Sequence, residues 1–134
     1  MGDDPGLSGL QLATLRALWE LREGTTAEVQ RVLARSRRLA ITTVSTLLSR
    51  LEKRGLVTHR AMGRSFIYRA VVSETEVRRS TIRTVLRDVF RDDPSALLIQ
   101  LVSQRDFDEA DLKTMKKLLA GARVRFRRKT RRPR

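Results

Sequence analysis

The chain has no cysteine and only one histidine, His59, among its 134 residues. Without cysteine there is no disulfide, no thiolate metal site and no thiol chemistry. A single histidine leaves almost no material for a classical zinc site or for a Ser/His/Asp triad. We therefore expect no metal, no cofactor and no enzymatic activity.

Long hydrophobic runs are also missing. The longest apolar run, around residues 96–102, is far too short to span a bilayer. The acidic start, residues 1–6, lacks the apolar segment of a signal peptide and is expected to be a flexible lead-in. These features predict a soluble cytoplasmic protein with no membrane partner. The length suits one domain, or two very small ones that share a core.

Acidic residues are few, since 15 Asp and Glu stand against 29 Lys and Arg, which gives a formal charge of +14. Eight of the positive charges lie in residues 121–134, where there is no acid, so residues 1–120 carry +6. This balance favours a polyanionic partner, either nucleic acid or an anionic membrane. Residues 122–134 contain too few apolar side chains to order alone and are expected to be a disordered basic tail. Such a tail either binds DNA without sequence preference or only keeps the chain soluble.

Two capping boxes mark the starts of the first two helices, Ser8-x-x-Gln11 and Thr25-x-x-Glu28. In each box a hydroxyl and a longer polar side chain satisfy each other's free backbone donors. We expect Gly24 to end the first helix, because glycine readily adopts the left-handed conformation found there. The apolar side chains expected on the inner faces of both helices are Leu12, Leu15, Leu18, Trp19, Val29, Val32 and Leu33.

The third helix is expected over residues 40–55, and it separates two kinds of side chain. Its apolar residues recur at helical spacing and predict one inward-facing stripe. They are Ile41, Val44, Leu47, Leu48 and Leu51. Its opposite side and flanks carry hydroxyls and cations, which suit a groove lined with phosphates and base edges, although any solvated helix face can look alike. These residues are Thr42, Thr43, Thr46, Ser49, Arg50 and Lys53.

A β-hairpin is expected directly after this helix. Residues 56–60 and 65–69 are rich in β-branched and aromatic side chains, and a glycine turn over residues 61–64 separates them. Three short helices followed by a hairpin predict a winged helix-turn-helix over residues 7–72, with the third helix in the recognition position. We expect Arg60 and Arg64 to form a basic tip near DNA, or merely to keep an edge hairpin soluble.

Three further helices are expected after the hairpin. A third capping box, Ser73-x-x-Glu76, opens a helix to about Arg91, and Asp92-Asp93-Pro94 breaks it. Residues 95–104 are almost wholly apolar, and Asp108-x-x-Asp111 caps a last helix that Gly121 closes. The fold class predicted is therefore mainly α.

These last three helices span fewer than fifty residues. Their apolar surface is larger than such a small unit can bury within itself. We expect residues 73–121 to form a homodimerisation domain, although domain exchange or packing onto residues 1–70 would also cover this surface. The side chains expected at the dimer interface are Val85, Val89, Leu97, Leu98, Leu101, Val102, Leu112, Met115 and Leu118.

Several of these motifs resemble the penicillinase-repressor family of bacterial winged-helix regulators, the BlaI/MecI type. The resemblance covers roughly residues 7–120. The segments that carry it are Leu7-Ser8-x-x-Gln11-x-x-x-Leu15-x-x-Leu18-Trp19, Ile41-Thr42-Thr43-Val44-x-Thr46-Leu47-Leu48-x-Arg50-Leu51, Lys53-Arg54-Gly55-Leu56-Val57 and Gly63-Arg64-Ser65-Phe66-Ile67-Tyr68.

The resemblance implies a transcriptional repressor that binds a palindromic double-stranded DNA operator as a homodimer and is nucleoid-associated when bound. The third helix would lie in the major groove, and the C-terminal helices would form the dimer. Carried onto this chain, the resemblance implies that Thr42, Thr43, Thr46 and Arg50 meet bases or phosphates and that Arg64 meets the DNA backbone from the hairpin. We also expect Arg38 and Lys53 to contact the backbone.

Three features depart from the family pattern, and the first two leave the inducing signal and any upstream sensor open. The β-lactam-responsive members are cleaved at an Asn-Phe bond, and this chain has no asparagine. The copper-responsive relatives carry a C-terminal cysteine cluster, which is absent here. Ile41 stands where the family usually has an aromatic residue, which predicts altered packing or a different operator preference.

Two other classes of protein share parts of this pattern. A basic architectural or RNA-binding module would contact the nucleic-acid backbone without choosing a sequence. A protein–protein adaptor would use the winged helix without nucleic acid, which fits the fold but not the charge. Competition with random duplex DNA separates the first of these from an operator-binding repressor.

Overall fold

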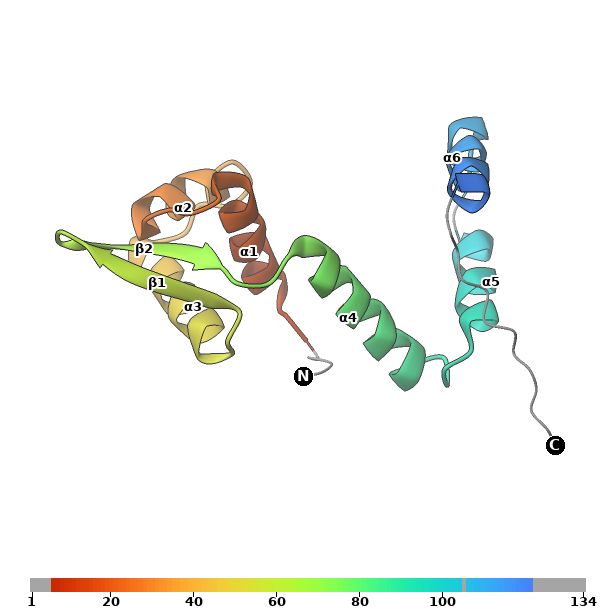
Figure 1. Cartoon of the computed structure of the whole chain (residues 1–134), viewed down its shortest axis with the longest axis horizontal. Coiled ribbons are helices and arrows are strands. Elements are labelled where there is room, and N and C mark those ends of the chain that lie inside the picture. Colours follow the sequence, from red (N-terminus) through yellow and green to blue (C-terminus); the bar gives the residue numbers. More distant parts are fainter. Residues whose placement is uncertain (1–5, 105, 122–134) are drawn as a thin grey trace. The chain divides into compact units, whose positions relative to one another are not determined.

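A computed structural model describes residues 6–104 and 106–121 (Figure 1). Its contacts divide the chain at residues 92 and 93 into two units, which are described separately below. The elements are mainly helical with one two-stranded antiparallel hairpin, so the predicted fold class is confirmed. They are α1 (Gly9–Leu21), α2 (Thr26–Leu33), α3 (Ile41–Lys53), β1 (Val57–Met62), β2 (Ser65–Ala70), α4 (Glu74–Asp88), α5 (Pro94–Gln104) and α6 (Glu109–Gly121).

The capping boxes expected from the sequence are present. In α1 the Ser8 hydroxyl accepts a hydrogen bond from the Gln11 amide, and the Gln11 side chain accepts one from the Ser8 amide, both at 3.1 Å. The same reciprocal pairs open α2 and α4, with Thr25 and Ser73 in the capping position. These local bonds satisfy donors that the helix itself leaves free, and they fix where each helix begins.

The end of α1 differs from the expectation. The helix stops at Leu21, and Arg22 adopts the positive φ of 78° that was expected at Gly24. Gly24 instead forms an isolated bridge to β2, where its amide donates to the Tyr68 carbonyl at 2.9 Å and its carbonyl accepts from the Tyr68 amide at 2.8 Å. A Cβ at Gly24 would lie 3.0 Å from the side chain of Leu21, so this close approach favours glycine.

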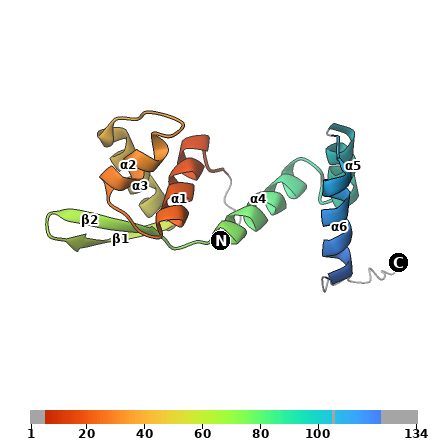
Figure 2. The ribbon, with the colours of Figure 1, turned by 90° about the horizontal axis from the view of Figure 1, so that it is seen from above.

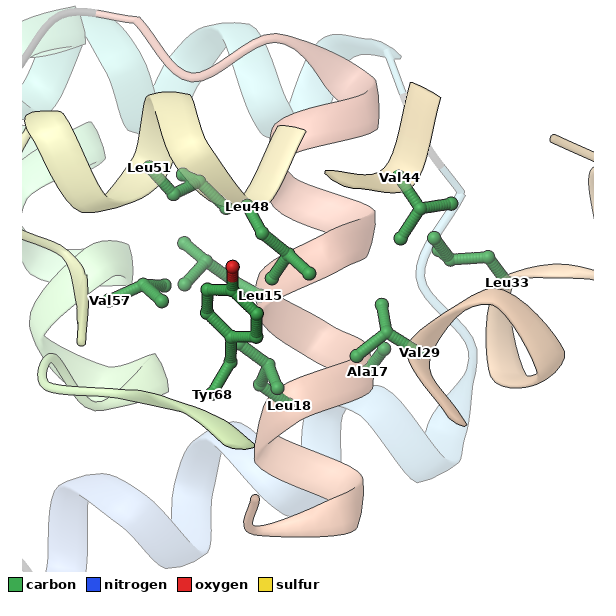
Figure 3. Close-up of a cluster of buried hydrophobic side chains, with 10 residues drawn as sticks. All are labelled: Leu15, Ala17, Leu18, Val29, Leu33, Val44, Leu48, Leu51, Val57 and Tyr68. Carbon is green, nitrogen blue, oxygen red and sulfur yellow. The ribbon is translucent and has the colours of Figure 1, made fainter. Parts of the chain in front are cut away.

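The hydrophobic core of the first unit joins the three helices and the hairpin. Figure 3 shows side chains from α1, α2, α3, β1 and β2 converging on one another. Four of the five apolar positions expected in α3 are buried, whereas Ile41 is 42% exposed. Ile41 is the first residue of the helix, and the core reaches only as far along it as Val44. The core residues are Leu15, Ala17, Leu18, Val29, Leu33, Val44, Leu48, Leu51, Val57 and Tyr68.

The hairpin is longer and tighter than expected. Met62 pairs with Ser65, so only Gly63 and Arg64 form the turn, and Gly63 has a φ of 62°. At its base, Val57 and Tyr68 are buried in the core. The tip projects beyond the helices in both views of the ribbon (Figures 1 and 2). Core packing therefore anchors one end of the hairpin and leaves the other end in solvent.

The start of α4 belongs to the first unit. The indole nitrogen of Trp19 donates to the Val72 carbonyl at 2.9 Å, and Val77 packs against the core. The helix ends at Asp88 rather than near Arg91, and the chain then turns with positive φ at Arg91 and Asp92. The contacts thus group α4 with the winged helix, while a functional boundary at residue 72 stays a prediction.

The second unit contains α5 and α6. The Asp93 carboxylate accepts hydrogen bonds from the amides of Ser95 and Ala96 at the start of α5. Asp108 and Asp111 cap α6 reciprocally, as expected. Neither helix has a buried residue. The predicted stop of α6 after Gly121 and the basic tail lie outside the described residues.

Candidate nucleic-acid interface

The solvent-facing side of α3 carries five of the seven residues predicted to contact DNA. Four leucine and valine side chains of this helix are buried, and this fixes which side of it faces outward. The exposed side then presents hydroxyls and cations together. The five residues, each exposed, are Thr42, Thr43, Thr46, Arg50 and Lys53.

The first turn of α3 is capped differently from those of α1, α2 and α4. Ala40 occupies the capping position and provides no side-chain hydrogen bond. Free backbone amides at a helix N-terminus, together with the helix dipole, favour an anion such as phosphate. Thr42 and Thr43 lie in this same turn, so their hydroxyls stand at the positive end of the helix dipole, while the Thr43 amide itself donates to the Ala40 carbonyl at 3.0 Å.

The one acidic residue of α3 is turned toward the hairpin. Nδ1 of His59 in β1 lies 2.8 Å and 2.9 Å from the two carboxylate oxygens of Glu52. The His59 ring also contacts Phe66 and Tyr68 of β2, with ring centroids 4.5 and 5.3 Å apart. Burial raises the pKa of Tyr68 above its usual value, and the nearby Glu52 charge adds to this shift. Glu52 thus links α3 to the hairpin.

The loop before α3 carries the sixth predicted residue, Arg38, which is exposed. The side-chain amide of Gln30 in α2 donates to the Leu39 carbonyl at 2.9 Å. Arg35 is paired with Glu20 at 2.8 Å. Gln30 therefore positions the chain just before the candidate recognition helix, a role that its sequence context did not reveal.

The hairpin separates the two arginines that were expected at its tip. Arg64 is exposed in the two-residue turn. Arg60 instead lies within β1 and forms a two-point ion pair with Glu23. The hydrogen bond from Arg60 lowers the pKa of Glu23, and the same bond raises the pKa of Arg60. The expectation of a basic tip made by both residues was therefore wrong for Arg60.

Within residues 6–104 and 106–121, no cluster of three or more His, Asp or Glu side chains could hold a metal ion. Over those same residues, no helix has both the length and the apolar character needed to cross a membrane.

The three helices, the hairpin and their shared core define a winged-helix unit. The family model described as penicillinase repressor matches residues 7–121. The chain therefore belongs to the penicillinase repressor family, and the resemblance seen in the sequence is confirmed.

Curated relatives carry the names of regulators. The chain is 18% identical over 113 residues to the methicillin resistance regulatory protein MecI of Mammaliicoccus sciuri, covering 84% of this chain and 92% of that protein. It is 29% identical over 72 residues to the penicillinase repressor of Bacillus licheniformis, covering 54% of this chain and 56% of that protein.

Solved structures give similar matches. The Bacillus licheniformis BlaI monomer, solved in complex with the blaP half-operator, aligns with a TM-score of 0.48 at 29% identity, over 57% of this chain and 93% of that one. The structure of hsRosR-S4 aligns with a TM-score of 0.54 at 17% identity, over 88% of this chain and 90% of that one. The second likeness concerns the fold alone.

Proposed function

We propose that this chain is a sequence-specific transcriptional repressor that binds a palindromic operator as a homodimer. The observation that carries the proposal is the division of α3, whose apolar side is buried in the core while its hydroxyl-and-cation side is exposed. Membership of the penicillinase repressor family supports the same assignment. An α-helix with this composition fits the major groove of B-form DNA.

The residues of α3 have different roles in this proposal. Thr42, Thr43 and Thr46 read base edges and thymine methyl groups, and Arg50 contacts a base or a phosphate. Each good bidentate base contact contributes about 1–3 kcal/mol of discrimination. Phosphate contacts supply affinity without sequence information. They come from Arg38, Lys53 and Arg64, and the positive end of the α3 dipole adds to them.

The homodimer is proposed from the unpartnered apolar surface of α5 and α6. On α5, Leu98 is 60% exposed and Val102 is 55% exposed, and on α6 Leu118 is 64% exposed. A helix that is apolar on most of its surface needs neighbours on several sides. A second copy of the chain supplies them, and the two α3 helices would then lie about one turn of DNA apart, roughly 34 Å.

The proposal is tested by sequencing the genomic DNA fragments that the purified full-length protein retains. A single enriched sequence with twofold symmetry, and half-sites about 10 bp or a multiple of that apart, is the expected result. Competition with random duplex DNA then measures specificity. Equal binding to enriched and random duplexes would favour the basic architectural alternative and refute the repressor proposal.

A further inference from the structure

A cleft between α1 and α4 has no role in the DNA contacts proposed above. We propose that it binds a small aromatic carboxylate, which acts as an effector of DNA binding. The cleft has a volume of about 330 Å³ and lies within the first unit. Its lining is mostly apolar, with Leu12 and Trp19 on α1 and Val77 and Ile82 on α4.

The size and lining of the cleft suit a small planar ligand. Ligand pockets typically occupy about 300–1,000 Å³ and combine an apolar lining with a few polar groups, so this cleft lies at the lower end of that range. The indole nitrogen of Trp19 already donates to the Val72 carbonyl, so its polar atom needs no ligand. An aromatic ring therefore suits the cleft, because it can pack on the Trp19 indole and the aliphatic side chains without disturbing this hydrogen bond.

The net positive charge of the cleft lining favours a negatively charged ligand. Arg16 and Arg78 both line it, together with the single carboxylate of Glu74, so the lining carries one excess positive charge. Arg78 is paired with Glu74 at 3.1 Å. Arg16 forms no ion pair with any residue in the described part of the chain. A guanidinium beside an apolar surface complements a carboxylate attached to a ring, because the two can form parallel hydrogen bonds.

The link to DNA binding rests on the function proposed above. A ligand in the cleft contacts α1, which belongs to the winged helix, and also α4, which precedes α5 in the sequence. It would therefore stabilise one arrangement of α4 on α1. A ligand shifts operator affinity when the DNA-bound form prefers a different arrangement, and the operator then changes ligand affinity by the same factor.

Binding is measured first on the full-length protein without DNA, by calorimetry with 1-naphthoate and phenylacetate, each beside its neutral amide. Trp19 is the only tryptophan, so its fluorescence gives a second readout of the same site. We expect one saturable site per chain and acids that bind about tenfold more tightly than amides, because the amides lose the charged hydrogen bond.

Two variants locate the site. Arg16→Ala should remove the preference for acids over amides. Arg79→Ala should retain it, because Arg79 lies on the same helix as Arg78 but does not line the cleft. Absence of saturable binding, equal affinity for acid and amide, or an unchanged preference in Arg16→Ala would each overturn the assignment of the site.

The effector role is measured next, with the operator. A saturating acid should change the operator affinity of the unmodified protein by about fivefold or more, and that of Arg16→Ala not at all. An unchanged operator affinity despite binding in the cleft overturns the effector role and leaves the proposed function intact. Failure of the ligand-free protein to prefer any DNA sequence refutes the proposed function instead, while the measurements of the cleft without DNA still stand.

Discussion

The guanidinium of Arg60 donates two hydrogen bonds to the carboxylate of Glu23, with Nη1 2.8 Å from Oε1 and Nη2 3.3 Å from Oε2. This pair joins β1 to the short segment between α1 and α2. It also compensates the charge of Arg60, one of the arginines of the hairpin. Arg64, in contrast, forms no ion pair within the residues that the structure describes. The two arginines should therefore differ in their contribution to DNA binding.

Replacing Arg64 by alanine should weaken operator binding and reduce its salt dependence. Each phosphate contact contributes about 0.9 to the slope of log K against log salt concentration, so the slope should fall by about that amount. Arg60→Ala is the matched control and should change the slope less, because Glu23 already compensates this charge. Titrations of operator DNA at several salt concentrations measure both. A larger loss of slope in Arg60→Ala would contradict the assignment.

Two substitutions in α3 test base readout. Arg50→Ala should cost about 1–3 kcal/mol of operator binding if the side chain makes a bidentate base contact. Thr46→Val keeps a methyl group for a thymine and replaces the hydroxyl by a second methyl group, so it should relax sequence preference at one position of the operator. Arg79→Ala on α4 removes an exposed positive charge outside the candidate surface and should leave operator affinity unchanged. Operators with one altered base pair, titrated with each variant, locate the contact.

The local chemistry of the helices could be read from the sequence. The bonds between Ser8 and Gln11 span one turn, so their spacing alone predicts them. The buried stripe of α3 follows from its helical period in the same way. Ile41 was misplaced because periodicity assigns a face of the helix but does not show how far along the helix the core extends.

The contacts that shape the interface could not be predicted, because they join residues that are distant in the chain. Arg60 and Glu23 are 37 positions apart, and nothing near Arg60 distinguishes it from Arg64. Gly24 carries an ordinary signal for the end of a helix, yet its pairing with Tyr68 depends on where the hairpin packs. Charge and pattern thus indicated which residues are candidates for the interface, while tertiary packing decides which of their charges are compensated.

The dimer proposal is tested with Leu98→Glu on α5. Leu98 is 60% exposed in the single chain, so a charge there should leave the fold of one protomer intact. In a dimer the same charge would be buried without a partner, and it should dissociate the dimer. Gln100→Glu adds the same charge at a polar position of the same helix and should remain dimeric. Sedimentation of both variants, with helix content checked by circular dichroism, distinguishes the outcomes; equal masses would exclude this face of α5 as the interface.

Removal of residues 122–134 separates affinity from readout. These residues carry eight positive charges and no acid, and they lie outside the described part of the structure. Their removal should flatten the salt dependence of DNA binding, because fewer counterions are released. Sequence preference should remain, since the proposed base contacts lie on α3. Loss of that preference in the shortened protein would place the readout in the tail.

Tyr68 should make the stability of the first unit fall at alkaline pH. Burial raises the pKa of this phenol above its ordinary value, so above about pH 10 the unfolded chain loses a proton that the folded chain keeps. The free energy of unfolding therefore decreases as the pH rises through this range. Tyr68→Phe removes this contribution, and its stability relative to the unmodified protein should rise between about pH 9 and pH 11. Urea unfolding followed by Trp19 fluorescence measures the difference in stability between the two proteins.

Tyr68 is the only tyrosine, so tyrosinate absorbance reports its titration directly. If the difference in stability stays constant between about pH 9 and pH 11, the phenol titrates alike in the folded and unfolded states, which contradicts the prediction.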